Sequence, residues 1–388
     1  MRVTQVRTYV LKQPTETAYL GKLNDGSAPA PDQGYFVRPP WRSLYSASME
    51  TVLVRVTTDE GVEGWGEALA PVGPEVVAAI IDRMLGPWLV GRDPLQVRPL
   101  WDGMRDLMRE RGHLAGHQAD ALAALDIALW DLAGKAAGLP VAQLLGGVYR
   151  TEIPAYISGL PEPTDEGRAE LAADWAKRGA SMVKLALGNG VEKDLATYDA
   201  VAAAAPGLGI AIDAHWVYSL PQALELGHEL DRRRALFFEA PLAPEDIAGH
   251  QELASRVTTP IAVGEALRNR YEFRDWFDRR ATGLAQPDVA RTGITEAMTV
   301  ATLADARHIP VACHHSVGLG VALAAGLQVA AAVADSPFFE LQPTTLPFAQ
   351  RILRTPITHT ASGFTLPQGP GLGIDIDQEV LDGLVQGG

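Results

Sequence analysis

The sequence contains only one cysteine, Cys313, so an intramolecular disulfide is excluded. A chain without disulfides fits a reducing compartment. Its first residues, Met-Arg-Val-Thr-Gln-Val-Arg, lack the apolar core of a signal peptide, and no apolar run is long and uninterrupted enough to span a bilayer. We therefore expect a cytoplasmic protein that has no membrane partner.

Positive charge is also scarce. The 388 residues include 33 lysines and arginines against 47 aspartates and glutamates, which gives a formal net charge of −14. Such an acidic chain is not expected to bind nucleic acid or an anionic membrane as its main partner. It can still bind an anionic small molecule if a cation lies between the two.

Hydrophobic residues, in contrast, make up 47% of the chain, and the length favours a main domain plus a second one. From residue 210 onward, short apolar runs end in a polar residue at intervals of 23 to 26 residues. Each interval is long enough for one strand, one helix and two short loops. The pattern predicts a parallel barrel of βα units, whose polar strand ends meet at one mouth. These strand ends are Asp213, Glu239, Glu265, Asp288, His314 and Glu340.

The first part of the chain has a different pattern. Val3–Leu11 alternates like a strand, and Thr51–Glu67 is typical of a hairpin around the turn Asp59–Gly61. Ala119–Gly138 has a helical leucine stripe that ends at glycine. We expect an α/β protein with three parts: an α+β capping domain over residues 1–125, the barrel over residues 126–355, and a C-terminal segment, residues 356–388, that returns to the cap.

The stretch Tyr19–Pro40 is rich in glycine, proline, asparagine and aspartate. Long irregular segments are either disordered or functional, for example as lids. We expect an irregular loop that can close over the barrel mouth. Four cap residues could reach a substrate there, although an ordinary surface position is favoured for each: Lys22, Arg42, Tyr45 and His113.

Three carboxylates, Asp213, Glu239 and Glu265, follow neighbouring predicted strands. Close together and uncompensated, they would repel and raise one another's pKa values. Mg²⁺ resolves this repulsion, because it takes six oxygen ligands and leaves positions for water and substrate. The alternative is three solvated or salt-bridged loop residues, but their matching positions favour a magnesium site.

Asp288 and His314 end the next two predicted strands. The carboxylate could hold one ring nitrogen of the histidine and leave the other as a general base. The alternative is two unconnected polar residues. His315 is a rival for His314, and since strand residues alternate between faces, only one of the two should point into the mouth.

Two further basic residues belong to the predicted mouth. Lys184 ends the second barrel strand, where it could act as a base, an acid or an anchor for a carboxylate, unless it is a surface lysine. His215 lies two residues after Asp213, on the same side of the strand, and is a candidate general acid. Its alternative is a loop histidine with no proton to move.

Several segments together resemble the enolase superfamily, and within it the mandelate racemase subgroup, over nearly the whole chain. Each segment alone is a weak signal, but the set is highly specific. The segments are Gly64–Ala68 (Gly-Trp-Gly-Glu-Ala), Ala124–Lys135, Leu144–Gly147, Phe238–Pro241, Gln286–Asp288 and Pro370–Gly373.

The resemblance implies a modified (β/α)7β barrel of the TIM type under an α+β cap. It also implies Mg²⁺ on Asp213, Glu239 and Glu265, and a His314–Asp288 dyad. His314 is preferred over His315 because the family's acid-sugar dehydratases have glycine four positions after the histidine, here Gly318. The implied common reaction is removal of the proton α to a carboxylate.

Departures from the family pattern narrow the reaction. The subgroup's racemases have a second lysine on strand two, where this chain has Ala186. The muconate-lactonising subgroup uses a lysine on the sixth strand, and this chain has no lysine after Lys193. The remaining pattern is similar to galactonate dehydratase, in which His215 would protonate the departing hydroxyl. Glu340, the last of the strand ends, is a further candidate catalytic residue.

We therefore expect a Mg²⁺-dependent hydro-lyase that converts a sugar acid to a 2-keto-3-deoxy acid and forms a homo-oligomer. Epimerisation or lactone cycloisomerisation is the alternative reaction. A protein that binds metal and acid without catalysis is a further alternative, although binding alone needs no base. Nothing in the sequence selects one sugar acid, since a fold does not set specificity.

Overall fold

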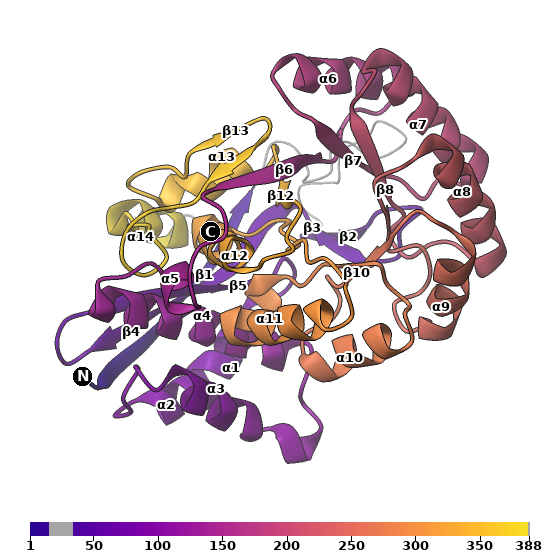
Figure 1. The fold of residues 1–388 in the computed structure, drawn as a ribbon. Helices are drawn as coiled ribbons and strands as arrows, with labels where there is room; N and C mark the ends of the chain where they lie inside the picture. Colours follow the sequence, from indigo (N-terminus) through magenta and orange to yellow (C-terminus); the bar gives the residue numbers. More distant parts are fainter. Residues whose placement is uncertain (15–33, 387–388) are drawn as a thin grey trace.

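The computed structural model describes residues 1–14 and 34–386. Within these residues, a cap built on an antiparallel sheet lies against a barrel of parallel strands (Figure 1). No helix in this part of the chain combines the length and apolarity that crossing a bilayer requires. The expected modified (β/α)7β barrel with an N-terminal cap is confirmed.

The cap sheet has the order β1-β4-β5. Alternate residues of β4, namely Val52, Val54 and Val56, are fully buried and form a core with the cap helices. The predicted hairpin is confirmed, because β4 and β5 pair antiparallel around a turn with Gly61 at a φ of 76°. The elements are β1 (Val3–Pro14), β4 (Ser48–Thr58), β5 (Glu63–Ala68), α1 (Pro74–Ile80), a π-helical turn (Ile81–Leu85), α2 (Gly86–Leu89), α3 (Val97–Asp106), a 3-10 turn (Arg109–Arg111) and α4 (His117–Ala137).

Helix α4 joins the cap to the barrel. Its predicted leucine stripe, including Leu125 and Leu129, packs into the cap core, whereas Ile127 packs into the barrel core. The helix contacts both β5 and α11 (Val289–Asp305) and ends at Gly138 in the left-handed conformation. The division predicted after residue 125 falls inside this helix, and the domain boundaries stay a prediction.

The barrel strands form one parallel ladder in the order β12-β6-β7-β8-β9-β10-β11. Parallel bridges continue it to residues 311–314, and the His315 N–H donates to the carboxylate of Glu340 on β12, so this segment links the two ends. The strands are β6 (Glu152–Ser158), β7 (Met182–Ala186), β8 (Gly209–Asp213), β9 (Phe238–Glu239), β10 (Ile261–Val263), β11 (Leu284–Ala285) and β12 (Phe339–Leu341).

Helices surround the strands on the outside, as Figure 1 shows for α6 to α10. They are α5 (Val141–Leu144), α6 (Asp165–Lys177), α7 (Val191–Ala204), α8 (Leu220–Arg233), α9 (Ile247–Arg256), α10 (Arg270–Asp278), α11, α12 (Gly320–Ala332) and α13 (Leu346–Ala349), followed by a 3-10 turn (Gln350–Ile352).

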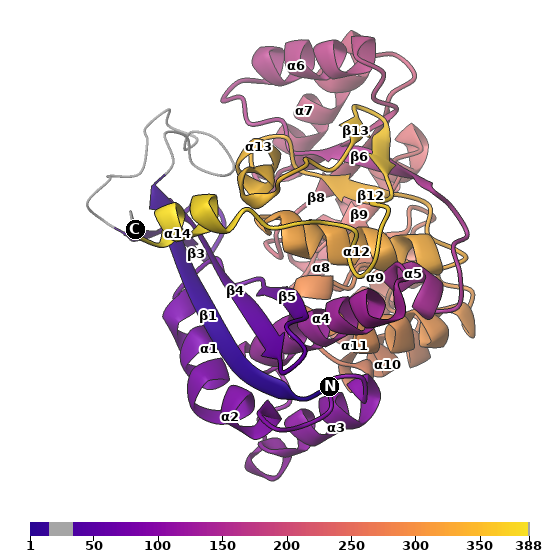
Figure 2. The ribbon, with the colours of Figure 1, turned by 90° about the vertical axis from the view of Figure 1, so that its left-hand side faces the viewer.

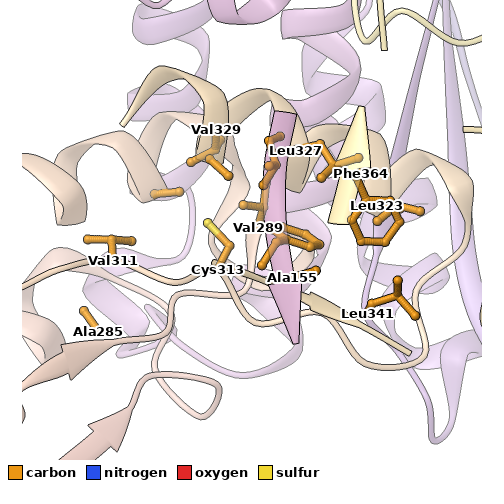
Figure 3. Close-up of a cluster of buried hydrophobic side chains, with 14 of the residues drawn as sticks. Ala155, Ala285, Val289, Val311, Cys313, Leu323, Leu327, Val329, Leu341 and Phe364 are labelled. Atoms are coloured by element: carbon orange, nitrogen blue, oxygen red, sulfur yellow. The ribbon is translucent and has the colours of Figure 1, made fainter. Parts of the chain in front are cut away.

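Helix α12 is buried along its whole length. It contacts β6 on one side and β5, α5 and α11 on others, so it needs an apolar surface all round. Figure 3 shows Leu323 and Leu327 of this helix in one cluster with Ala155 of β6, Leu341 of β12 and Phe364 of β14. The loop that carries His314 leads into α12 and is therefore anchored at its end by a tightly packed core.

The C-terminal segment contacts both parts of the molecule. Its hairpin, β13 (His359–Thr360) and β14 (Gly363–Thr365), pairs antiparallel with the first barrel strand, β6. Its last helix, α14 (Gln378–Gln386), lies against β1 of the cap (Figure 2).

The predicted irregular loop Tyr19–Pro40 is corrected in part. Residues 19–33 lie outside the described residues, so the expected lid is not tested. The remainder contains β2 (Tyr35–Val37), which pairs antiparallel with β3 (Leu44–Ser46). Three consecutive bulky residues form this strand, although the prolines after them suggested a loop.

The contact between β5 and α4 predicts a packing defect. A Cβ on Gly66 would lie 1.8 Å from the carbonyl oxygen of Ala124, so Gly66→Ala must push the sheet and helix apart. We expect it to lower the free energy of unfolding by ~1–3 kcal/mol or more, measured by urea denaturation. Gly383→Ala is the control, because an added Cβ on this exposed α14 position meets no atom within 4 Å. Equal stability of the two variants would contradict the close approach.

Candidate active site

A cavity of about 350 Å³ lies between the barrel mouth and residues 43–50 of the cap. Most of the predicted strand-end residues reach it, since the carboxyl ends of the parallel strands open on this side. The lining includes Lys184, Asp213, His215, Glu265, His314 and Glu340, together with Tyr45 from the cap. Arg42 and His113 are exposed and do not line it, and Lys22 lies outside the described residues.

The three predicted metal ligands lie at neighbouring strand ends, and Asp213 pairs in register with Glu239. The tightest group of potential ligand atoms is formed by Glu239, Glu265 and His314, within 4.8 Å of one another. Asp213 lies outside this group. Its Oδ1 accepts the backbone N–H of His215 at 2.9 Å, and its Oδ2 is 3.9 Å from Nζ of Lys184.

The donor set fits a hard divalent cation. Burial raises the pKa of Asp213 to about 7, with Lys184 opposing this shift and Glu265 adding to it. Burial also raises the pKa of Glu239 to about 7. The cluster is therefore short of positive charge, and carboxylate oxygens are the ligands that Mg²⁺ prefers.

Lys184 is the main protein cation within the cluster. Its Nζ lies 3.0 Å from both carboxylate oxygens of Glu239 and 3.0 Å from Oε1 of Glu340. Burial lowers the pKa of this lysine, but the two carboxylates outweigh burial and raise it well above its ordinary value. Lys184 is therefore a fixed positive charge, suited to holding an anion rather than to taking a proton.

Glu340 connects the lysine to the histidines. Ser158 donates to Oε1 at 2.5 Å, and the His315 backbone N–H donates to Oε2 at 3.0 Å. Burial raises the pKa of Glu340, but Lys184 and His314 outweigh burial and lower it to about 2. This carboxylate is ionised and held in place.

The structure brings His314 and Asp288 together. Oδ2 of Asp288 accepts from Nδ1 of His314 at 2.6 Å, while Oδ1 accepts the N–H of Ala290 and caps α11. Nε2 of His314 is 3.1 Å from Glu265. Burial lowers the pKa of His314, but Glu340, Asp288 and Glu265 outweigh burial and raise it well above its ordinary value. The dyad holds one ring nitrogen and aims the other at the acidic cluster.

His315 turns away from the cavity, as strand alternation predicts. It is buried, its ring centroid lies 5.9 Å from that of Phe339, and it does not line the cavity. Burial lowers its pKa to about 4. His315 is therefore a neutral core residue.

His215 lies in the cavity wall against an aromatic residue that the sequence pattern did not identify. Its imidazole stacks on Trp41, with ring centroids 3.7 Å apart and planes 10° apart. Nε1–H of Trp41 donates to the carbonyl of Leu187 at 2.7 Å, which fixes the indole. His215 and Trp216 both have positive φ, 49° and 62°, so the chain turns sharply after β8 and directs the imidazole inward.

Burial lowers the pKa of His215 to about 4, against the opposing carboxylate of Glu265. Its Nδ1 is 3.2 Å from Oδ1 of Asp213 in a geometry that makes no hydrogen bond. The two cavity histidines thus have pKa values pushed in opposite directions, which is typical of a pair with different proton-transfer roles.

Spacing could not identify Trp41 or Arg291, which also line the site region, because neither ends a strand. Trp41 belongs to the proline-containing cap segment, and Arg291 lies in the first turn of α11. Only the three-dimensional structure places them beside the strand-end residues.

Removing one carboxylate tests the cation site without an activity assay. Mg²⁺ at about 100 times its Kd would stabilise the wild type by ~2.7 kcal/mol, raising its Tm. We expect Glu239→Gln to lose most of this Mg²⁺-induced rise, because a ligand and a negative charge are removed. Glu245→Gln is the control, because Glu245 is an exposed loop residue. A full Mg²⁺ response in Glu239→Gln contradicts the assignment.

Two family models match the chain. Residues 37–146 match the mandelate racemase / muconate lactonizing enzyme N-terminal domain, and residues 167–380 match the enolase C-terminal domain-like family. The chain is 32% identical to D-galactarolactone cycloisomerase of Agrobacterium fabrum over 98% of each protein. It is 32% identical to arabinonate dehydratase of Saccharolobus solfataricus, over 88% of this chain and 92% of that protein. A crystal structure of an enolase-superfamily member from Agrobacterium tumefaciens matches with a TM-score of 0.92 and 37% identity, over 98% of each chain.

Proposed function

Since the chain belongs to the mandelate racemase / muconate lactonizing enzyme family of the enolase superfamily, we propose that it is a Mg²⁺-dependent sugar-acid dehydratase. The observation that carries this proposal is the His314–Asp288 dyad and His215 on the same acidic cavity. The names of the dehydratases among its relatives support a sugar acid as substrate.

Asp213, Glu239 and Glu265 would hold Mg²⁺, which would supply positive charge to stabilise the anion that forms when the α-proton leaves. Lys184 is a fixed cation in the same cavity and would hold the substrate carboxylate from the β7 side. Together these charges would allow a protein with a net charge of −14 to bind an anion.

His314 would take the α-proton. Its Nδ1 is held by Asp288, so Nε2 is the nitrogen that faces the cavity. A base must be unprotonated, whereas Glu265 at 3.1 Å favours the protonated imidazole. If Glu265 holds the cation, its negative charge is compensated. The pKa of His314 would then fall toward values at which the imidazole can accept a proton.

His215 would act as the acid. The α C–H bond breaks toward His314, the β C–O bond breaks, and the hydroxyl leaves as water with the proton from His215. The resulting enol tautomerises to a 2-keto-3-deoxy acid. Because the pKa of His215 is lowered in the free site, the negative charge of the bound substrate is what would raise this pKa enough for the imidazole to carry that proton.

A lactone cycloisomerase is the second candidate, because one relative with this activity matches over 98% of both proteins. It would use the same base, but the leaving group would be the ring oxygen of a lactone instead of a hydroxyl. A substrate panel that contains sugar acids and their lactones separates the two. The homo-oligomeric state and cytoplasmic location expected from the sequence stay predictions.

Two variants separate the roles of the histidines. We expect His314→Asn to lose both exchange of the α-hydrogen with solvent and formation of the keto acid, each by ~10²–10⁴-fold. We expect His215→Asn to lose keto-acid formation but to keep exchange, because His314 can still remove and return the α-proton. NMR in D₂O measures exchange, and a keto-acid assay measures turnover.

A His215→Asn variant that loses exchange as fully as His314→Asn would overturn this division of roles. Conversion of one stereoisomer to another without keto acid would instead identify an epimerase.

The stack on Trp41 gives a further prediction. Trp41→Leu removes the flat surface that orients the imidazole of His215, so we expect keto-acid formation to fall by ~10-fold or more while α-hydrogen exchange stays near wild type. Trp41→Phe also lacks the N–H that donates to Leu187, but it keeps a stacking ring and should therefore retain most of the turnover that Trp41→Leu loses. Equal loss of exchange and turnover in both variants would mean that Trp41 only stabilises the cap.

A further inference from the structure

Arg291 is a basic residue of the cavity wall for which the described residues provide no ion-pair partner. It lies in the first turn of α11, three residues after Asp288, and lines the cavity. Its Nε is buried without a hydrogen-bond partner, and no residue in the described part of the chain makes an ion pair with its guanidinium. The side chain as a whole is half-buried, and a donor buried in this way is costly unless a ligand supplies an acceptor.

The neighbouring arginines are paired. Arg268 also lines the cavity. Its Nε donates to Oδ1 of Asp120 at 3.1 Å, and its Nη1 donates to the carbonyl oxygen of Ala266 at 2.7 Å. Arg270 forms an ion pair with Glu296. Burial lowers the pKa of Arg291 and Arg268 adds to this shift, whereas Asp120, Asp288 and Glu265 oppose it.

Asp120, Asp288 and Glu265 lie near enough to affect the pKa of Arg291, but within the described residues none of them forms a hydrogen bond or an ion pair with its guanidinium. Oε1 of Glu265 accepts from Trp216 at 3.0 Å, and Oε2 is 3.1 Å from His314. Asp288 accepts from His314 and from the N–H of Ala290. The free side of Arg291 is the cavity itself.

The position of Arg291 in the barrel indicates which part of a substrate it meets. Lys184 is on β7 and Arg291 follows β11, four places further along the strand order, so the two lie on opposite sides of the mouth. Lys184 is already compensated by Glu239 and Glu340, and Arg291 is not. A substrate held at the acidic cluster can extend across the mouth toward Arg291.

We propose that Arg291, with Arg268 beside it, binds a second carboxylate of the substrate, so that the enzyme acts on sugar diacids or on lactones that retain a free carboxylate. This inference rests on the proposed sugar-acid reaction and names its substrate class. The cavity of about 350 Å³ is large enough for a small polar molecule of this kind. A monoacid with a terminal hydroxymethyl group would leave the guanidinium unpaired, and sites built for a polar partner reject analogues that lack it.

Matched substrates test the proposal. Six-carbon sugar diacids (hexarates) and the corresponding monoacids (hexonates) differ only in the oxidation state of C6. We expect the wild type with Mg²⁺ to prefer a hexarate over its hexonate by on the order of 10²-fold or more in kcat/KM. Arg291→Gln should lose most of that preference by slowing the hexarate, with little change for the hexonate, and Arg291→Lys should keep part of it.

Arg307→Gln is the matched control, because Arg307 lies at the far end of the same helix region and pairs with Asp278 on the outside of the barrel. It should keep the wild-type preference. Circular dichroism and thermal melts establish that each variant is folded. If Arg291→Gln fails to fold, the wild-type preference and the Arg291→Lys variant decide.

Calorimetric titration of the same hexarates and hexonates separates this inference from the proposed reaction. Tighter binding of the hexarate, lost in Arg291→Gln, supports the second carboxylate site even if no substrate is turned over, and in that case the proposed reaction alone is wrong. Equal binding and turnover of both acids by the wild type, or an equal loss of both in Arg291→Gln, overturns the inference and leaves Arg291 as a support for Glu265 and Asp288.

Discussion

The site depends on electrostatic repulsion among carboxylates held in a buried cluster. Five of them, at the ends of five barrel strands, are within reach of only a few positive groups. In a buried environment such charges interact far more strongly than in water. Lys184 compensates Glu239 and Glu340, and His314 is shared by Asp288, Glu265 and Glu340. The negative charge that remains uncompensated favours the proposed cation site and raises the pKa of His314, whereas burial outweighs the same carboxylates at His215 and lowers its pKa.

Such a cluster needs a rigid frame, and three other buried carboxylates provide it. Glu67 of β5 accepts the N–H groups of Leu319 and Ala322 at the start of α12, directly after the His314 loop. Asp126 of α4 accepts from Thr295, beside the kink of α11. Asp131 of α4 accepts backbone N–H groups of Trp65 and Leu372. Each carboxylate joins segments that are far apart in sequence, which ties the cap to the barrel loops.

The sequence predicted the features that leave a periodic trace. The strand-end residues follow the βα repeat, so the barrel and most of its mouth could be predicted. The segments that carried the family resemblance contain Glu67, Asp126 and Asp131, whose buried hydrogen bonds give a physical reason for these motifs. Contacts between segments that are distant in sequence leave no such trace: the stack of Trp41 on His215 and the place of Arg291 in the cavity wall depend on packing. Strand β2 was missed because prolines follow it closely.

The central claim is that this cavity removes the proton α to the carboxylate of a sugar acid. The most direct measurement follows the α-hydrogen of sugar acids by proton NMR in D₂O, with the wild-type protein and either Mg²⁺ or a chelator. The account predicts that for at least one acid the α-hydrogen signal disappears with Mg²⁺ and persists with the chelator. Persistence of the α-hydrogen of every acid in the presence of Mg²⁺ would contradict it and would leave a protein that binds metal and acid without catalysis.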